Sequence, residues 1–142
     1  MRYLLIVSHG EFSAGLHDTF EMLMGKREDV LHVGLKNGMG VPELKEQLLK
    51  VIAPVQPEDE ILVVADIIGG SPLTTTMEVL AEEFDLSRVR AVGGMNLPMT
   101  MAAIECEDDP IDDAVEAMVA TAAEQIAPFK LDIGDDDEEE DL

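Results

Sequence analysis

The chain has 142 residues, 46% of them hydrophobic, so its length predicts one domain whose core needs no disulfide or metal. A formal net charge of −22 at pH 7 argues against nucleic acid and anionic membranes as partners, because phosphate groups are bound by lysine and arginine. The single cysteine, an N-terminus without signal-peptide features and the lack of a long apolar run predict a cytoplasmic protein.

Strand and helix patterns alternate along the chain. Short apolar runs predict strands over residues 3–7, 30–35, 60–66 and 89–94. The first and third runs are continuous, which is typical of parallel strands buried on both faces. Apolar residues at helical spacing predict helices over residues 12–25, 41–53, 71–84, 97–106 and 111–127. Ser13 and Ser71 are the predicted N-caps of the first and third helices, and Gly25 ends the first.

This alternation predicts an α/β fold in which helices cover both faces of a parallel sheet. We expect a flavodoxin-like, doubly wound sheet with strand order 2-1-3-4. The segment "FKLDI" (129–133) alternates apolar and polar residues after a short turn, which predicts a last strand lying antiparallel at an edge. Residues 1–133 are the predicted domain, and residues 134–142, which include "DDDEEED", a disordered acidic tail.

Functional groups in such a sheet gather at the carboxyl ends of the strands. The first, third and fourth predicted strands end in "SHG", "DIIGGSP" and "GGMNLPM". In the order 2-1-3-4 the first and third strands are neighbours. His9 and Asp66 are therefore predicted to emerge side by side, directly below Gly69, Gly70 and Ser71.

These residue types suit a phosphorylated histidine. A carboxylate bonded to one imidazole nitrogen fixes the tautomer and leaves the other nitrogen as a nucleophile, so Asp66 is predicted to orient His9. Gly69 and Gly70, placed before a helix, let backbone N–H groups approach an anion, and Ser71 adds a hydroxyl donor. The sequence lacks GxxxxGK[ST] and has no lysine near these motifs, which disfavours kinase or ATPase chemistry. We predict neither a cofactor nor a metal.

Each of these features also has a structural interpretation. His9 can be a plain strand-end residue, the two glycines can permit a tight turn, and Ser71 can be only an N-cap. His17 and His32, on the first helix and the second strand, are predicted to be structural. The segment "GGMNLPM" is either a turn before a helix or part of a partner-binding surface. The candidate residues for the wall of that surface are Met95, Asn96 and Met99.

Three motifs in the order "IVSHG", "VVADIIGGSP" and "VGGMNLPM" resemble the EIIA components of the mannose-type (mannose, fructose, sorbose) sugar phosphotransferase system, over roughly residues 1 to 130. The resemblance implies that phospho-HPr phosphorylates His9, with Asp66 as its carboxylate partner and Ser71 beside the phosphate. It also implies transfer to a histidine of EIIB during sugar uptake, with the membrane components EIIC and EIID as indirect partners. Finally, it implies a homodimer in which "FKLDI" is exchanged between subunits.

Three other functions remain open from the sequence. One is a non-catalytic flavodoxin-like module that binds a small phosphorylated ligand at the same edge. Another is the phosphocarrier subunit of a dihydroxyacetone kinase system, a related branch whose middle motif lacks the "GGSP" found here at 69–72. The third is an acidic interaction protein that binds through its tail. The transported sugar is not predicted.

Overall fold

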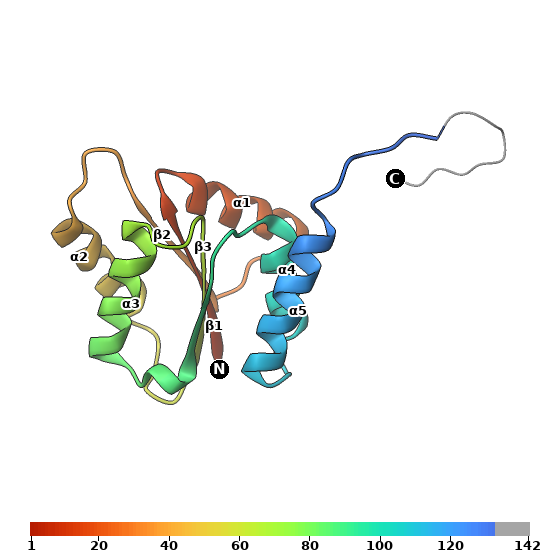
Figure 1. Cartoon of the computed structure of the whole chain (residues 1–142). Coiled ribbons are helices and arrows are strands. Elements are labelled where there is room, and N and C mark those ends of the chain that lie inside the picture. Colours follow the sequence, from red (N-terminus) through yellow and green to blue (C-terminus); the bar gives the residue numbers. More distant parts are fainter. Residues whose placement is uncertain (133–142) are drawn as a thin grey trace.

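The computed structural model describes residues 1–132, in which a parallel sheet lies between two layers of helices (Figure 1). The strands are β1 (Arg2–His9), β2 (Val30–Leu35), β3 (Glu60–Ala65) and β4 (Val89–Val92). Their order is β2-β1-β3-β4, and each neighbouring pair is parallel. The predicted doubly wound sheet with order 2-1-3-4 is therefore confirmed.

Helices cover both faces of this sheet. They are α1 (Phe12–Met24), α2 (Val41–Val51), α3 (Ser71–Glu83), α4 (Leu97–Glu105) and α5 (Ile111–Glu124), with a short 3₁₀ turn, η1 (Leu86–Arg88), before β4. Helices α1, α4 and α5 pack on one face, and α2 and α3 pack on the other (Figure 1). The loops after β1, β3 and β4 thus lead from the carboxyl ends of these strands into the helix layers.

Strand β1 explains the continuous apolar run near the start of the chain. Leu4 and Ile6 face the core beneath α1, α4 and α5, whereas Tyr3, Leu5 and Val7 face the core beneath α2 and α3. All five are at most 7% exposed. Burying one such side chain stabilises the fold by about 1.5–3 kcal/mol, so β1 holds both layers together.

The first helix begins differently from the prediction. Glu11, not Ser13, is the residue before its first turn, and the Ser13 hydroxyl instead donates to the Val33 carbonyl at 2.9 Å. The Ser13 N–H donates to the Ser8 hydroxyl oxygen at 2.7 Å. Ser13 therefore joins α1 to β2, a partner that lies 20 residues away. The predicted end of α1 is confirmed, because Gly25 follows its last turn with a φ of 86°.

The segment after α5 leads away from the sheet and carries no strand over residues 126–132 (Figure 1). Its apolar side chains Ile126, Phe129 and Leu131 are 75%, 71% and 58% exposed. The predicted antiparallel edge strand is thus not formed within one chain, because this segment lies beside no strand of its own sheet. Pairing with a second copy stays a prediction. Residue 133 and the predicted acidic tail, 134–142, lie outside the described residues.

Candidate functional site

His9 and Asp66 meet at the carboxyl edge of the sheet, as predicted. The register of β1 and β3 pairs Val7 with Ala65, so both residues lie just beyond the last paired positions. The Oδ2 atom of Asp66 is 2.8 Å from His9 Nδ1 and also accepts the His9 backbone N–H at 2.9 Å. One carboxylate oxygen thus fixes both the backbone and the ring of His9. With Nδ1 held this way, Nε2 is the ring nitrogen left for chemistry.

The environment of Asp66 favours its ionised form. Burial by itself raises the pKa of this carboxyl group, but hydrogen bonds from His9 and Ile67 outweigh burial and lower the pKa below its ordinary value. The Ile67 N–H donates to Oδ1 at 2.9 Å, so both carboxylate oxygens are bound. Asp66 is 13% exposed, whereas the His9 side chain is 47% exposed. The arrangement combines a fixed, ionised carboxylate with an accessible imidazole.

The N-terminus of α3 lies against the His9 ring. Gly70 is the N-cap of α3, and a Cβ atom at this position would lie 2.8 Å from His9 Cε1 and 3.4 Å from Nε2. Only a glycine leaves room for the ring there. Gly69 has a φ of 86°, a conformation that glycine adopts without strain and that turns the chain into α3. The free nitrogen of His9 therefore faces a helix N-terminus, where N–H groups and the helix dipole favour an anion.

Ser71 is not the N-cap that the sequence predicts. It is the first residue of α3 and is exposed, and within residues 1–132 no side chain caps this helix. The extended backbone of Gly70 takes the N-cap position instead, because that position touches the imidazole and excludes a side chain. Ser71 nevertheless follows Gly70 directly, so its hydroxyl remains a candidate donor to a group bound at His9.

A glycine from the neighbouring loop, Gly93, supports the turn between Asp66 and Gly70. A Cβ atom at Gly93, in the loop after β4, would collide with the side chain of Ile68. Ile68 itself is 80% exposed on its outer side. The loops after β3 and β4 therefore pack closely behind the site. The sequence shows this only as a second "GG", at 93–94, for which no packing role was predicted.

Met95, Asn96 and Met99 do not form the predicted surface as a group. Met99 is 3% exposed and belongs to the core, so that part of the prediction is wrong. Asn96 caps α4, accepting the Met99 N–H at 2.9 Å and donating to the Ala122 carbonyl at 3.1 Å. Met95 is 5% exposed and, with Asn96, lines an apolar groove of about 490 Å³ beside α1. A partner role for these two residues stays a prediction.

His17 and His32 lie away from His9 and contact each other. Their ring centroids are 4.6 Å apart, and His17 Nε2 is 3.7 Å from a carboxylate oxygen of Glu21. Burial, together with His17 and Lys36, lowers the pKa of His32 below its ordinary value. The pair joins α1 to β2, in agreement with the structural role predicted for both residues.

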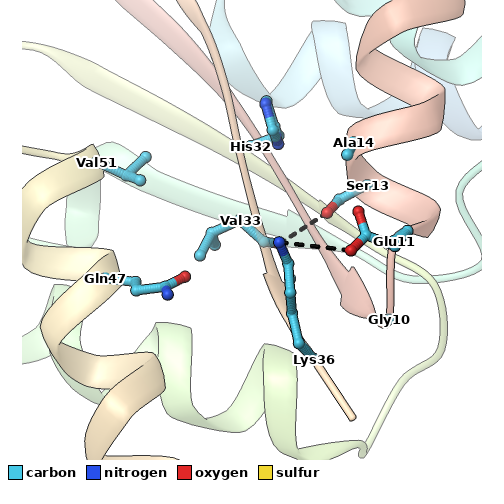
Figure 2. Close-up of a pocket in the computed structure, with 10 residues that line it drawn as sticks. Gly10, Glu11, Ser13, Ala14, His32, Val33, Lys36, Gln47 and Val51 are labelled. Carbon is cyan, nitrogen blue, oxygen red and sulfur yellow. Dashed lines mark hydrogen bonds and ion pairs between the residues drawn. The ribbon is translucent and has the colours of Figure 1, made fainter. Parts of the chain in front are cut away.

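Two cavities flank the end of β2, and Lys36 lines both. One, of about 390 Å³, opens beside His9. The other, of about 100 Å³, lies between α1, β2 and α2, and Figure 2 shows Lys36 extended from the end of β2 toward Glu11 there. The Lys36 ammonium is 3.5 Å from Glu11 Oε2. The prediction that no lysine lies near the motifs is therefore wrong for the folded chain. The available signal was the position of Lys36 directly after the second strand, at the same sheet edge as His9.

Residues 1–132 contain neither a helix that could span a membrane nor a cluster of metal-binding side chains. None of the helices there is both long enough and apolar enough to cross a membrane. No group of three or more histidine, cysteine, aspartate or glutamate side chains in this part of the chain is arranged to hold a metal ion.

The family model described as "PTS system fructose IIA component" matches residues 3–126. The chain belongs to the mannose-type EIIA family of the sugar phosphotransferase system (PTS). It is 26% identical over 105 residues to the fructose-specific EIIA component of Bacillus subtilis, covering 74% of this chain and 70% of that protein. It is 27% identical over 121 residues to the mannose-specific EIIAB component of Escherichia coli K12, covering 85% of this chain but only 36% of that longer protein.

Solved EIIA structures share the fold of this chain. The EIIA component from Streptococcus agalactiae superposes with a TM-score of 0.78 at 27% identity, covering 91% of this chain and 98% of that one. The mannose/sorbose-specific IIA subunit from Enterococcus faecalis superposes with a TM-score of 0.80, covering 93% of this chain and 97% of that one. Its identity of 20% supports likeness of fold alone.

Proposed function

We propose that this EIIA chain is a phosphocarrier that accepts a phosphoryl group from phospho-HPr on Nε2 of His9 and passes it to a histidine of an EIIB component. The observation that carries the proposal is the 2.8 Å contact between His9 Nδ1 and Asp66. It commits one ring nitrogen to a carboxylate and turns the other toward the N-terminus of α3. Phosphoryl transfer needs such a positioned nucleophile beside preorganised donors.

The proposed reaction exchanges one P–N bond for another. The lone pair of His9 Nε2 attacks the phosphorus atom of the donor's phosphohistidine as the donor P–N bond breaks. The electron pair of that bond returns to the donor imidazole. His9 keeps its Nδ1 proton, which it donates to Asp66 throughout, so the transfer moves no proton between the proteins. Passage to EIIB is the same exchange in reverse.

The protein's contribution to this reaction is position and local charge. The phosphoryl group would enter at the N-terminus of α3, where the Gly70 backbone, the Ser71 hydroxyl and the helix dipole favour negative charge. This local effect matters because the chain as a whole carries a charge of −22. Asp66, held ionised by three N–H donors, stabilises the positive charge that the imidazole ring acquires.

The relatives support a role in sugar phosphotransfer without selecting one sugar. Their names specify fructose in Bacillus subtilis and mannose in Escherichia coli. A structural neighbour from Streptococcus pneumoniae is a IIA protein associated with a fucose utilization operon; it is 28% identical, with a TM-score of 0.75, and covers 89% of this chain and 92% of that one. The proposal is therefore limited to the phosphocarrier step shared by such systems.

Incubation with phospho-HPr followed by mass spectrometry tests the proposal. The wild-type chain should gain the mass of one phosphoryl group in an acid-labile, base-stable bond. His9→Ala should gain none while unfolding at the wild-type temperature. His17→Ala is the matched control, because it removes another histidine but should gain phosphate normally.

Two results would contradict the phosphocarrier role. A wild-type chain that binds phosphate only reversibly would point to the non-catalytic ligand-binding module. Full phosphorylation of His9→Ala would move the nucleophile elsewhere.

The same function is proposed to operate in a homodimer. Ile126, Phe129 and Leu131 are exposed on a segment that leaves the domain, and among the strands of residues 1–132 β4 pairs only with β3. An open edge and a free apolar segment suit mutual exchange between two copies. Sedimentation should show a dimer at micromolar concentration, and truncation after Gln125 should give a monomer or an aggregate. A full-length monomer, with the truncated form equally soluble, would rule out the exchange.

A further inference from the structure

We propose that Lys36 binds the phosphoryl group on His9, its ammonium moving from Glu11 in the free protein to the phosphoryl oxygens in the phosphorylated protein. The inference rests on the proposed phosphorylation of His9 and adds a residue to that site. The observation behind it is that Lys36 and His9 line one cavity, of about 390 Å³, at the carboxyl edge of the sheet.

The register of the sheet places Lys36 beside the site. Strands β1 and β2 pair His9 with Leu35, and the Gly10 N–H donates to the Leu35 carbonyl at 2.8 Å. Lys36 directly follows the last residue of β2, so its backbone is fixed one position beyond Leu35, the partner of His9. Among residues 1–132, its side chain is the only lysine or arginine that lines the cavity beside His9. A flexible four-carbon stem lets the ammonium sample that cavity.

The present partner of Lys36 holds it weakly. The ammonium is 3.5 Å from Glu11 Oε2, and the two side chains are 52% and 73% exposed. An exposed pair of long side chains contributes little stability, because water screens the charges and the contact costs side-chain freedom. Figure 2 shows the two side chains meeting among the residues that line the smaller cavity, with Lys36 extended from the strand end. Exchanging one exposed oxygen for another therefore costs little.

A phosphoryl group would attract this ammonium more strongly than Glu11 does. It carries close to two negative charges and three acceptor oxygens, against one charge on a carboxylate. At His9, Asp66 is the negative group and the N-terminus of α3 lies against the ring, whereas Glu11 is the negative group beside Lys36. Lys36 approaches from β2, the side opposite α3. The phosphoryl group would thus lie between a helix N-terminus and a cation.

Chemical phosphorylation tests the inference without HPr. Phosphoramidate transfers its phosphoryl group to His9 Nε2 and releases ammonia, the leaving nitrogen taking a proton from water. The ³¹P chemical shift of the phosphohistidine is then followed against pH in the wild type, Lys36→Met and Lys36→Arg. A nearby cation favours the dianion, so loss of the charge in Lys36→Met should raise the titration midpoint by about half a pH unit, a threefold change in proton affinity. Lys36→Arg should keep the wild-type midpoint.

Lys45→Met is the matched control, because Lys45 forms a comparable exposed pair with Glu78, at 3.6 Å, and does not line the His9 cavity. It should titrate as the wild type does. An unchanged midpoint in Lys36→Met would overturn the inference, and so would an equal change in Lys45→Met. The proposed function is judged separately by loading from phospho-HPr. Loading from phospho-HPr with an unchanged Lys36→Met midpoint would refute only the Lys36 contact, and a shifted midpoint without such loading would refute only the HPr step.

Discussion

The two ends of the parallel sheet are built differently. At the amino ends of the strands, charged side chains are tied to partners from distant segments. Arg2, 9% exposed, donates to Glu60 at 2.9 Å and to the carbonyl oxygens of Cys106 and Asp109 at 3.0 and 2.6 Å. Arg27 donates to both oxygens of Asp29 at 2.9 Å and to Glu107 at 2.7 Å. These contacts hold the loop after α4 to the sheet.

At the carboxyl ends, the chain uses glycines and backbone contacts instead. His9 is held through one residue, Asp66, and the close approach of α3 depends on the missing side chain of Gly70. Lys36 forms an ion pair with Glu11, whose side chain is exposed. The two ends meet different requirements. Charged groups whose hydrogen bonds are all made stabilise the fold, whereas a site must keep a nitrogen and its neighbouring donors accessible to a partner. Substitutions at the two ends should therefore affect different measurements.

The largest effect is expected for Gly70→Ala, which acts on the carboxyl end alone. The new Cβ atom would lie 2.8 Å from His9 Cε1, so the ring must turn away and lose its alignment with Asp66. We expect phosphoryl transfer from phospho-HPr to slow by roughly a hundredfold, as for other small displacements of a reacting group. The unfolding temperature should change little, because His9 is half-exposed.

Gly15→Ala is the control for Gly70→Ala. A Cβ atom at Gly15 meets no atom within 4 Å, and alanine suits a helix better than glycine does. This variant should transfer phosphate at the wild-type rate. Equal rates in Gly70→Ala and Gly15→Ala would show that contact between α3 and the His9 ring has no part in transfer.

A smaller effect, on stability alone, is expected at the amino end. Arg2→Met removes three hydrogen bonds from a side chain that is 9% exposed, while its stem can still pack. We expect a loss of about 2 kcal/mol in the free energy of unfolding, measured in urea. Transfer to His9 should be unchanged at temperatures where the variant is folded. Arg88→Met, which removes one exposed bond to the Glu58 carbonyl, should lose much less. A slowed transfer in folded Arg2→Met would contradict the separation of the two ends.

The smallest effect is expected in the pH dependence of stability, and it comes from the His17–His32 pair, which lies between the two ends of the sheet. Burial first, then His17 and Lys36, lower the pKa of His32, against the weaker opposite effect of Glu21 and Glu11. A lowered pKa means that the unfolded chain binds the proton more tightly than the folded chain does. The free energy of unfolding therefore decreases as the pH falls below 6.5, the ordinary pKa of histidine, and through the pKa of His32 in the folded protein. His32→Gln should flatten this decrease in urea titrations between pH 7 and 5. A slope equal to that of the wild type would exclude His32 as its source.

Much of the site follows from strand ends and topology. A buried apolar run that stops at His9 and another that stops before Asp66 predict two neighbouring strands, and parallel strands bring their carboxyl ends to one edge. The pairing of imidazole and carboxylate was therefore predictable before any coordinate was known. The strand order and the elements were predictable for the same reason: periodicity records which faces are buried.

Other parts of the site depended on contacts between distant segments. Ser71 has the residue type of an N-cap, but the His9 ring occupies the space beside Gly70 and gives the cap to glycine. Met99 has the flexible side chain of a binding surface, but it is buried in the core beneath α1, α4 and α5. Arg2, near the start of the chain, shows no pattern that would reveal its bonds to Cys106 and Asp109. Residue type indicates what a side chain can do, and packing selects among those options.

By itself, the sequence determined the helices, the strands, their order in the sheet and the pairing of His9 with Asp66, because these depend on hydrophobic periodicity and on chain direction. Only the tertiary structure decided which nitrogen of His9 remains accessible, which residue caps α3 and which cation shares the cavity of His9. Those outcomes depend on distances between atoms that are far apart along the chain, such as the 2.8 Å between His9 Nδ1 and Asp66 Oδ2. Such distances are set when the core packs, and no local pattern of residues encodes them.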